Sequence, residues 1–481
     1  MIRRMTRREL LRVGGLGSMV AFLAACQPKV VEKIVEKEVT KIVKEVVQET
    51  VIVEGTPQVV EREVTRVVKE VVEVEKVVTP TPRLIAPAKK VKLVYWTILG
   101  NVDGIIMDAM VKQFEEGHPN IEVESFQGVP EFETKLQTSV LAGTGPDFVL
   151  YRLHYIAPYA DKGIVMPLDP GELSDLGIEK GIYDSRVWDA MHYQGEPYAV
   201  PLDIHLFALF RNRRIFEEGG LDPDIPPATL EEWYEMAKAL NKGGVIGTAI
   251  YGWPPGMFWI WYGLMKQWGG ELFLDEGTRV DLTTPAHIEP MEWWHRLRWD
   301  INPGAMNGDL IRTGQVGLWL DGPWTLSLWS DPERSKIVGE YDISLLPQHD
   351  PRKPAVWANS HLFSLPRPAQ PDVDKHVAAL ALMRWVSEHA LQWSAEAGQV
   401  PASKVVQDSY AWRQGGGPIL EGSRKFAEAL PYTVFFPQHP KMLEVGDRIA
   451  AALDSAVNTE EGSPEGAMAK ATEEVNQILA G

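Results

Sequence analysis

The sequence predicts an α/β fold for the part of the chain that follows residue 90. Short apolar stretches typical of buried strands alternate there with segments in which apolar residues recur every three or four positions, as on one face of a helix. Strands that alternate with helices in this way form β-α-β units around a parallel sheet. The region is about 390 residues long, which is long for one hydrophobic core, so we also expect two lobes or domains.

The first elements of this region follow one another in order. Three apolar runs predict strands: VKLVYW at 91–96, IEVES at 121–125 and DFVLY at 147–151. Two intervening segments each predict a helix with one apolar face, formed by Ile106, Met110 and Phe114 and by Phe132, Leu136 and Val140. Ligands of such sheets bind beyond the carboxyl ends of the strands. We therefore expect a site just after Trp96 and Tyr151.

Later segments contain helix start signals. Thr229 and Glu232 have the spacing of a capping box, in which the hydroxyl and the carboxylate each bond the other residue's backbone amide. At residues 284–285 and 463–464 a Thr or Ser cap precedes a proline, whose missing N–H costs nothing at a helix start. These signals predict helices that begin at residues 230, 285 and 464.

The first 25 residues have the form of an export signal. Arginines precede the apolar run at residues 13–25, which is shorter than the roughly 20 residues needed to span a bilayer. The run ends in LAAC at 23–26, and Cys26 is the only cysteine of the chain, so no intramolecular disulfide or thiolate-rich zinc site can form. The alternative is an uncleaved anchor helix.

The LAAC motif resembles the lipobox of bacterial lipoproteins, and the arginine pair at residues 7–8 resembles a twin-arginine export signal. The general secretion route is the alternative for export. The lipobox resemblance implies that Cys26 becomes the acylated first residue of the mature chain. We therefore expect an extracytoplasmic protein held by its lipid on the outer face of the cell membrane.

Residues 26–90 are predicted to form a low-complexity tether. Val, Glu, Lys, Arg and Thr dominate this segment, and similar stretches lie before and after residues 55–57. Its valines step by four and three positions, which is the spacing of a coiled-coil seam. Each half holds only about three heptads, however, and valine and threonine are poor helix formers. A solvated, partly ordered tether is our interpretation, and a coiled-coil stalk is the alternative.

Charge and missing motifs exclude several functions. The formal net charge is −18, and such an acidic surface repels nucleic acid and anionic lipid. The chain contains no HExxH, GxSxG or GxxxxGK[ST] motif and no cysteine nucleophile in its globular part. We therefore predict no catalytic residue, no metal site and no cofactor.

Five motifs of the globular region occur in the order of a known family. They are FEEGHPNIEVE, KLQTSVLAGTGPDFVLY, GEPYAVPLD, WGGELFLDEGTRVDLTTPA and GQVGLWLDGPWTLS. Together they resemble the family 1 extracellular solute-binding proteins of ABC transporters, and best the carbohydrate-binding, maltose-binding-protein-like members. The resemblance covers residues 90–481. It implies a two-lobed periplasmic-binding-protein fold with a hinge, an interlobe ligand cleft, and delivery of a sugar or oligosaccharide to the membrane permease.

The family fold also implies lobe boundaries. Lobe one would hold residues 91–203 and 357–402, and lobe two would hold residues 204–356 and 403–481. The chain would then cross between lobes near Asp203, Trp357 and Pro401.

A sugar ring has an apolar C–H face and a rim of hydroxyls, so its site needs flat aromatic and polar side chains. The chain has 17 tryptophans. The resemblance places Trp324, in DGPW, and Trp259 at positions where relatives stack an aromatic ring on the ligand. Trp96 and Tyr151 end predicted strands and are further candidates. The alternative for each is a core position, because large aromatic residues dominate buried area.

The polar candidates are Asp203, His205 and Asn359. Asp203 and His205 lie at the first crossing, where the family commonly places a hydroxyl-binding side chain. Asn359 begins Asn-Ser-His, where many members have a glycine pair, and Phe210-Arg211-Asn212 departs from the commoner aromatic pair as well. The alternative is that these polar residues cap or bridge structure.

Two other functions remain open on the sequence. Binding proteins for peptides, polyamines or iron share the fold, although the spacing shows neither a strongly acidic pocket nor convergent tyrosines or histidines. A lipid-anchored carbohydrate-active enzyme would need two carboxylates roughly 5 to 10 Å apart across a cleft, and nothing in the sequence selects such a pair.

Overall fold

A computed structural model describes residues 35–53, 56–74, 87, 89–302, 304 and 306–481. The predicted export signal and Cys26 lie outside the described residues. The chain divides into two compact units, Met1–Arg83 and Leu84–Gly481, which we treat separately.

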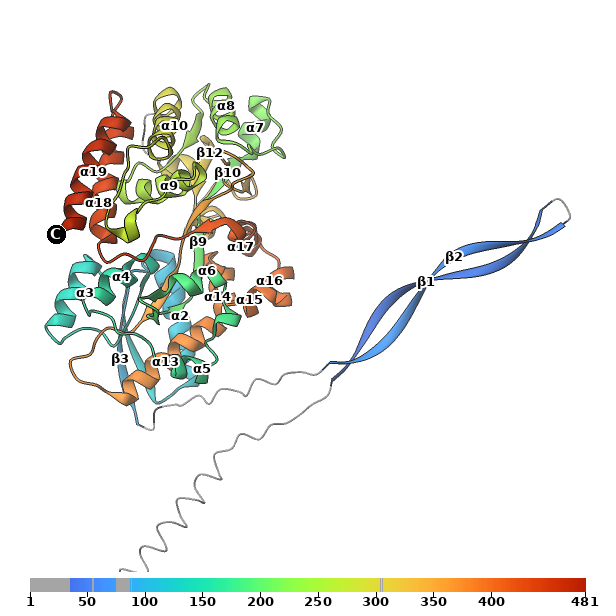
Figure 1. The fold of residues 1–481 in the computed structure, drawn as a ribbon, viewed down its shortest axis with the longest axis horizontal. Coiled ribbons are helices and arrows are strands. Elements are labelled where there is room, and N and C mark those ends of the chain that lie inside the picture. The colour runs from blue at the N-terminus through green and yellow to red at the C-terminus, as the bar shows by residue number, and fades with distance from the viewer. Residues whose placement is uncertain (1–34, 54–55, 75–86, 88, 303, 305) are drawn as a thin grey trace, which may run out of the picture. The chain divides into compact units, whose positions relative to one another are not determined.

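The first unit contains an antiparallel pair of long strands, β1 (Val35–Val53) and β2 (Thr56–Val74). The register joins Val53 to Thr56 and Val35 to Val74, and the pair twists as Figure 1 shows. The coiled-coil alternative for this segment is therefore wrong, and its two halves are regular strands where we expected a partly ordered tether. The composition explains the difference, because the β-branched residues Val and Thr favour extended backbone over helix.

The second unit begins with a five-stranded sheet of order β4-β3-β5-β15-β8. Its strands are β3 (Val91–Thr97), β4 (Ile121–Phe126), β5 (Phe148–Arg152), β8 (Val200–Pro201) and β15 (His361–Ser364). β3 pairs in parallel with β4 and β5, whereas β15 runs antiparallel to β5 and β8. The predicted strands and the α/β class are confirmed here.

Helices α2 (Asn101–Gly117) and α3 (Phe132–Leu141) connect the parallel strands, and α13 (Val373–Glu388) packs on β3. The six residues predicted to form the apolar faces of the first two helices are all buried. The periodicity therefore identified both helix faces correctly.

A second sheet has the order β11-β12-β10-β13. Its strands are β10 (Ala208–Asn212), β11 (Ile246–Ala249), β12 (Val316–Asp321) and β13 (Tyr341–Ser344). Three longer helices accompany it: α8 (Leu230–Leu240), α9 (Pro254–Gln267) and α10 (Pro285–Ile301). The predicted capping box at the start of α8 is present with both of its hydrogen bonds.

A third, smaller sheet of order β16-β9-β14-β17 lies between these two along the chain. Its strands are β9 (Asp203–Leu206), β14 (Val356–Asn359), β16 (Val400–Pro401) and β17 (Thr433–Val434). The chain passes through it on the way from β8 to β10 and again from β13 to β15. The three residues predicted as crossings, Asp203, Trp357 and Pro401, all belong to it. In Figure 1, β9 accordingly lies between the end that holds β3 and α13 and the end that holds α8 and α10.

The chain ends in two antiparallel helices, α18 (Met442–Val457) and α19 (Pro464–Ala480), which pack on each other and on α10. Ser463 caps α19 as predicted, since its hydroxyl accepts from the amide of Gly466. Thr284 precedes α10 as expected, but its hydroxyl bonds the Nδ1 atom of His287 rather than a backbone amide. None of the described helices is both long and apolar enough to cross a membrane.

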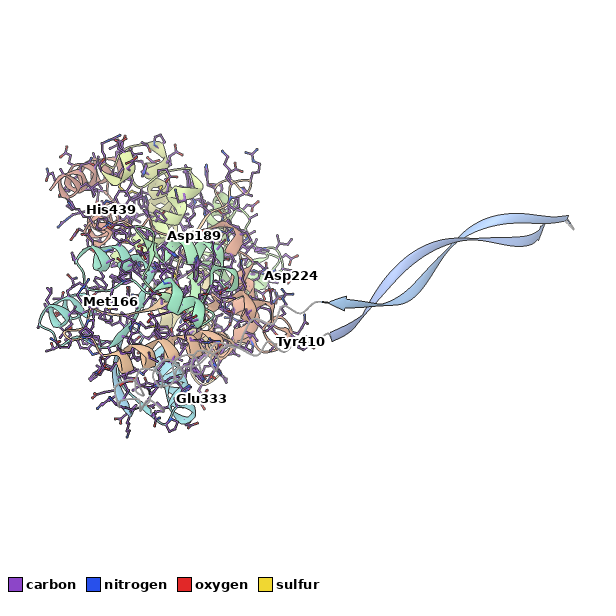
Figure 2. The ribbon with its side chains drawn as sticks, turned by 60° about the horizontal axis from the view of Figure 1, so that its bottom comes forward. Met166, Asp189, Asp224, Glu333, Tyr410 and His439 are labelled. Atoms are coloured by element: carbon purple, nitrogen blue, oxygen red, sulfur yellow. The ribbon has the colours of Figure 1, made fainter. Side chains whose placement is uncertain are left out.

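Shorter elements complete the second unit. The helices are α4 (Ile156–Asp161), α5 (Pro170–Asp175), α6 (Ser185–Ala190), α7 (Arg213–Gly219), α11 (Gly308–Arg312), α12 (Leu326–Trp329), α14 (Ala390–Ala397), α15 (Lys404–Asp408), α16 (Tyr410–Gln414) and α17 (Pro418–Ala427). The remaining pieces are β6 (His192–Tyr193), β7 (Glu196–Pro197) and the 3₁₀ turns η1 (Leu153–Tyr155), η2 (Lys180–Ile182), η3 (Asp275–Gly277), η4 (Pro323–Thr325) and η5 (Leu430–Tyr432). Side chains fill the space between all these ribbons (Figure 2), and the buried ones form one continuous apolar core.

Candidate ligand-binding cleft

A cavity of about 290 Å³ lies beside the small third sheet. Segments that follow β3, β9, β11 and β12 line it, together with side chains from β5, β9 and β15. These are the carboxyl ends of strands from both larger sheets, where α/β folds bind their ligands. The lining residues are Ile98, Leu99, Gly100, Asp103, Arg152, His205, Phe207, Tyr251, Trp253, Gly256, Trp259, Trp324 and His361.

A second cavity of about 460 Å³ adjoins the first and shares Arg152, Trp253 and Trp259 with it. Its other walls include Tyr155 and Phe436. We call the two cavities together the cleft. A further cavity of about 540 Å³, between residues 143–147 and 365–377, has no tryptophan, tyrosine or phenylalanine in its lining, so it is a poor match for a sugar ring.

Trp259 is half-buried in the cleft, and three neighbouring side chains contact its ring. Its ring stacks on Trp357 with centroids 5.0 Å apart and an interplanar angle of 3°. The guanidinium of Arg152 lies 5.5 Å from its ring centroid, and Trp253 meets it edge-on at 5.5 Å. Trp253 is 54% exposed, which is unusual for tryptophan. Trp253 and Trp259 are therefore two large aromatic side chains that a ligand in the cleft can contact.

Trp324 reaches the cleft from the turn after β12. Its ring meets His205 and Phe207 edge-on, with centroid distances of 5.8 and 5.6 Å. The ring folds back over Gly322, where an added Cβ would lie 2.1 Å from ring atoms. Only glycine fits at that position, which explains why the glycine of the DGPW motif precedes a tryptophan in this conformation.

Most other tryptophans have a different role. Nine of the other fifteen are buried in the core, namely Trp233, Trp261, Trp293, Trp294, Trp319, Trp329, Trp357, Trp393 and Trp412. Tryptophan abundance alone is therefore explained mainly by packing, and position is what distinguishes Trp259 and Trp324.

Asp203 lies behind the cleft wall and organises two histidines that line it. Its Oδ2 accepts from His361 Nδ1 at 2.8 Å and from Trp393 Nε1 at 2.8 Å. Its Oδ1 accepts from the backbone amide of His361 at 2.9 Å and lies 3.2 Å from His205 Nδ1. Burial alone would raise the pKa of Asp203, but the charge of His361 and the hydrogen bonds from His205 and His361 outweigh it, so the pKa falls well below its usual range. The carboxylate is thus ionised and saturated with donors.

His205 is neutral at physiological pH. Burial, reinforced by His361, lowers its pKa to about 4, although Asp203 opposes the shift. Since ionised Asp203 can only accept, a neutral His205 that donates from Nδ1 keeps an acceptor lone pair on Nε2. Of the predicted polar residues, His205 therefore lines the cleft directly, whereas Asp203 acts through its neighbours.

Two more carboxyl groups have raised pKa values near the cleft. Burial raises the pKa of Asp103 to about 6, against the effect of His361, and Asp103 lines the smaller cavity. Burial also raises the pKa of Asp321 to about 7. Asp321 lies behind Tyr251, whose hydroxyl donates to its Oδ1 at 2.7 Å. Both carboxyls thus hold protons at higher pH than free aspartate does.

Three predicted site residues do not line the cleft. Tyr151 is fully buried and its hydroxyl donates to Ser364 Oγ at 2.9 Å. Trp96 is half-buried against the core of the first sheet. Asn359 is buried as well, and its Oδ1 accepts from the amides of Leu153 and Ser360. These three side chains therefore lie outside the cleft, and their role in ligand binding stays a prediction.

Strand geometry explains why Tyr151 and Trp96 lie outside the cleft. Successive strand side chains point to opposite faces of the sheet, so the residue that ends the apolar run points into the core or over the sheet. The residues that reach the cleft come one to a few positions later, as with Arg152 after Tyr151 and Leu99 and Asp103 after Trp96. Arg152, Tyr251 and Trp253 were missed, although their places after predicted strands or before a predicted helix could have indicated them.

The buried set formed by Asp203, His205 and His361 also has the composition of a metal site. One possible ligand atom from each lies within 4.8 Å of the others. No sequence spacing indicates this set, because His361 comes from a strand far from His205 in the chain.

Comparison with known sequences shows the family to which the chain belongs. Residues 101–393 match the bacterial extracellular solute-binding proteins. The maltotriose-binding protein of Pyrococcus abyssi is 23% identical over 381 residues, which cover 76% of this chain and 77% of that protein. The mannitol-binding protein of Pseudomonas aeruginosa is 22% identical over 306 residues, covering 61% of this chain and 68% of the relative.

Solved structures show the same fold. A substrate-binding protein of Listeria monocytogenes in complex with cycloalternan superposes with a TM-score of 0.69 at 21% identity, over 82% of this chain and all of that one. Maltose-bound MalE3 of T. maritima superposes with a TM-score of 0.71 at 19% identity, over 81% of this chain and all of the other. The chain therefore belongs to the family 1 extracellular solute-binding proteins of ABC transporters and has their two-lobed periplasmic-binding-protein fold.

Proposed function

We propose that this protein captures a sugar or oligosaccharide outside the cytoplasm and delivers it unchanged to the permease of an ABC transporter. The observation that carries the proposal is the aromatic lining of the cleft, where Trp253, Trp259 and Trp324 meet polar side chains. Relatives named for binding maltotriose, mannitol and lactose, and structures with bound cycloalternan and maltose, support a carbohydrate ligand.

The polar groups of the cleft can form hydrogen bonds with the hydroxyl groups around a sugar ring. His205 offers an acceptor from one side, and the Arg152 guanidinium offers donors at the junction of the two cavities. Small-molecule sites are roughly 300–1,000 Å³, so the smaller cavity alone, at about 290 Å³, suits a small ligand. The adjoining 460 Å³ gives room for further sugar units and favours an oligosaccharide.

A ligand screen tests this function. Purified protein is melted with maltose, maltotriose, lactose, mannitol, spermidine and a peptide mixture, and hits are titrated by calorimetry. A ligand at one hundred times its Kd should stabilise the protein by about 2.7 kcal/mol, so a carbohydrate should raise the Tm. Chromatography after incubation should recover the sugar intact. A selective response to spermidine or peptides, or a cleaved sugar, would contradict the proposal.

Truncating the cleft tryptophans should weaken sugar binding. We expect Trp259→Ala and Trp324→Ala each to cost about 1–3 kcal/mol of binding free energy, roughly 5- to 150-fold in Kd, because aromatic anchors dominate well-packed sites. Trp188→Ala is the matched control, since Trp188 is half-buried but lines neither cavity. Calorimetry gives the affinities and melting curves report the stability of each variant. Unchanged affinity with a lowered Tm would make both residues core positions.

We also propose that Cys26 is the lipidated first residue of the mature chain and that it anchors the protein to the outer face of the cell membrane. The LAAC motif after a short apolar run supports this. A fatty-acid probe fed to expressing cells should label the wild type and leave Cys26→Ser unlabelled, with the variant released from the membrane fraction. Equal labelling of both proteins would refute the anchor.

A further inference from the structure

His154 lines the larger cavity of the cleft, and a buried asparagine contacts one edge of its ring. The Nδ1 atom of His154 lies 2.7 Å from Nδ2 of Asn359. The oxygen of the same amide, Oδ1, accepts from the backbone amides of Leu153 at 3.1 Å and Ser360 at 2.9 Å. Both of those partners are donors, so the hydrogen-bond network determines which side of the Asn359 amide is oxygen and which is nitrogen.

This contact sets the tautomer of His154. The NH₂ group of Asn359 can only donate, so Nδ1 of His154 accepts and bears no proton. Burial first, and then the charge of Arg152, lower the pKa of His154 to about 3, so the ring is neutral at physiological pH. A neutral imidazole without a proton on Nδ1 bears it on Nε2. His154 is therefore an N–H donor at Nε2, and this atom has no hydrogen-bond partner among the residues that the structure describes.

His154 and His205 consequently present opposite polarity to the cleft. His205 has its Nδ1 atom on the ionised carboxylate of Asp203, so its Nε2 atom is an acceptor. Aromatic neighbours keep the donor of His154 in place, because Tyr155 lies with its ring centroid 4.4 Å away and Phe436 meets the imidazole edge-on at 5.9 Å. Two histidines of one cleft thus offer different hydrogen bonds to a ligand.

The larger cavity holds acceptors as well as donors. Glu133 and Asp447 line it together with His154 and Arg152. The Oε1 atom of Glu133 accepts from the hydroxyl of Tyr155, which leaves most of the lone pairs of that carboxylate free. A sugar hydroxyl both accepts and donates one hydrogen bond, so it can use one group of each kind. A charged ligand group of either sign would instead meet a like charge in this cavity.

We propose that His154 is a ligand-contacting residue, whose Nε2–H donates to a hydroxyl oxygen of a neutral sugar unit in the larger cavity. Asn359 is the positioning residue that sets this donor, although it lines neither cavity itself. This inference rests on the proposed sugar binding and deepens it. It also makes the subsite selective, because a protonated amine has no acceptor bond to offer to His154.

Nuclear magnetic resonance of the full chain tests the tautomer without a ligand. Long-range ¹H–¹⁵N spectra at pH 7 show which ring nitrogen bears the proton, and the signals absent from His154→Phe identify the residue. We expect the proton of His154 on Nε2, whereas His192, whose Nδ1 lies 2.7 Å from the carbonyl oxygen of Trp188, should bear one on Nδ1. Asn359→Asp keeps the acceptor for the two backbone amides and replaces the NH₂ by an acceptor, so it should move a proton onto Nδ1 of His154. A proton on Nδ1 in the wild type would overturn the proposal.

Calorimetry tests the contact with the ligand. Maltose, maltotriose, lactose and mannitol are titrated, and the one that binds most tightly is used for the variants. His154→Phe should weaken its binding roughly three- to tenfold, the effect of one lost hydrogen bond, and His154→Gln, which keeps an amide donor, should lose less. His192→Phe is the matched control, since His192 is half-buried but lines neither cavity, and it should bind as the wild type does.

The outcomes separate this inference from the function on which it rests. If none of the four carbohydrates binds, the proposed function is refuted and the inference with it. If one binds and folded His154→Phe keeps its full affinity, only the inference is refuted. Saturating sugar should also shift the Nε2 signal of His154 in the unsubstituted chain more than that of His192, which decides the matter if His154→Phe fails to fold. An unmoved His154 signal would contradict the contact.

Discussion

Replacing Asp203 with alanine is expected to lower the free energy of unfolding by about 3–5 kcal/mol, because it leaves buried donors without their acceptor. His361 loses a partner for its backbone amide and its Nδ1 atom, and Trp393 loses one for Nε1. His205 Nδ1 loses its contact as well. Each orphaned buried donor costs roughly 1–3 kcal/mol, so several together justify a large effect.

Urea denaturation at pH 7 measures this loss. Asp203→Asn keeps the shape of the side chain but turns an amide NH₂ toward donors, so it should also destabilise. Asp189→Ala is the control, because Asp189 is exposed and forms a surface ion pair with Lys180. It should change stability little. A loss below 1 kcal/mol for Asp203→Ala would show that the network relaxes or admits water.

Because the pKa of Asp203 is lowered in the fold, the stabilisation that its carboxylate provides depends on pH. A carboxyl whose folded-state pKa is depressed stabilises the fold above its ordinary pKa of about 4. That stabilisation is lost as the pH falls through the folded-state pKa. Asp203→Ala should therefore differ less from the wild type under strongly acidic conditions than at neutral pH.

Local periodicity was sufficient to predict the elements of the first sheet. β3, β4 and β5 are short apolar runs, and the helices between them bury one apolar face each, so side-chain burial alone determines their type. The β1-β2 hairpin was missed because a spacing of three and four residues indicates a helix, while the β-branched composition favours a strand. Both the spacing and the composition are present in the sequence, and the sequence alone does not show which of the two determines the structure.

The family resemblance predicted His205, Trp259 and Trp324, and all three line the cleft. Trp324 follows a glycine that its own ring requires, so a short local motif indicates its position. Asp203 and His361 lie 158 residues apart in the chain and meet because β9 pairs with β14, which His361 at the start of β15 directly follows. No spacing rule links them, and the alternation of strand side chains decides whether Tyr151 or Arg152 reaches the cleft.

Replacing Asp321 with asparagine should stabilise the protein increasingly as the pH rises. Asp321 ends β12, fully buried, and its Oδ1 accepts from Tyr251 and from the amide of Gly322. Its Oδ2 has no hydrogen-bond partner among the described residues. Asparagine keeps the acceptor and removes the ionisable group, so the variant isolates the cost of ionising this side chain.

The sign follows from the pKa, which burial raises to about 7 in the fold against about 4 in the unfolded chain. Below pH 4 both states are protonated and the group has no effect. Between pH 4 and 7 the unfolded chain loses its proton while the fold keeps it, so wild-type stability falls by an amount on the order of 4 kcal/mol above pH 7. Urea denaturation of both proteins at pH 4, 6 and 8 should show the advantage of Asp321→Asn growing by that amount. Tyr251→Phe removes a hydrogen bond that lowers the pKa of Asp321. In a protein that carries Tyr251→Phe, the stability advantage of Asp321→Asn should therefore keep growing to higher pH. A pH-independent difference between Asp321→Asn and the wild type would mean that water or a bound cation reaches this carboxylate and lets it ionise normally.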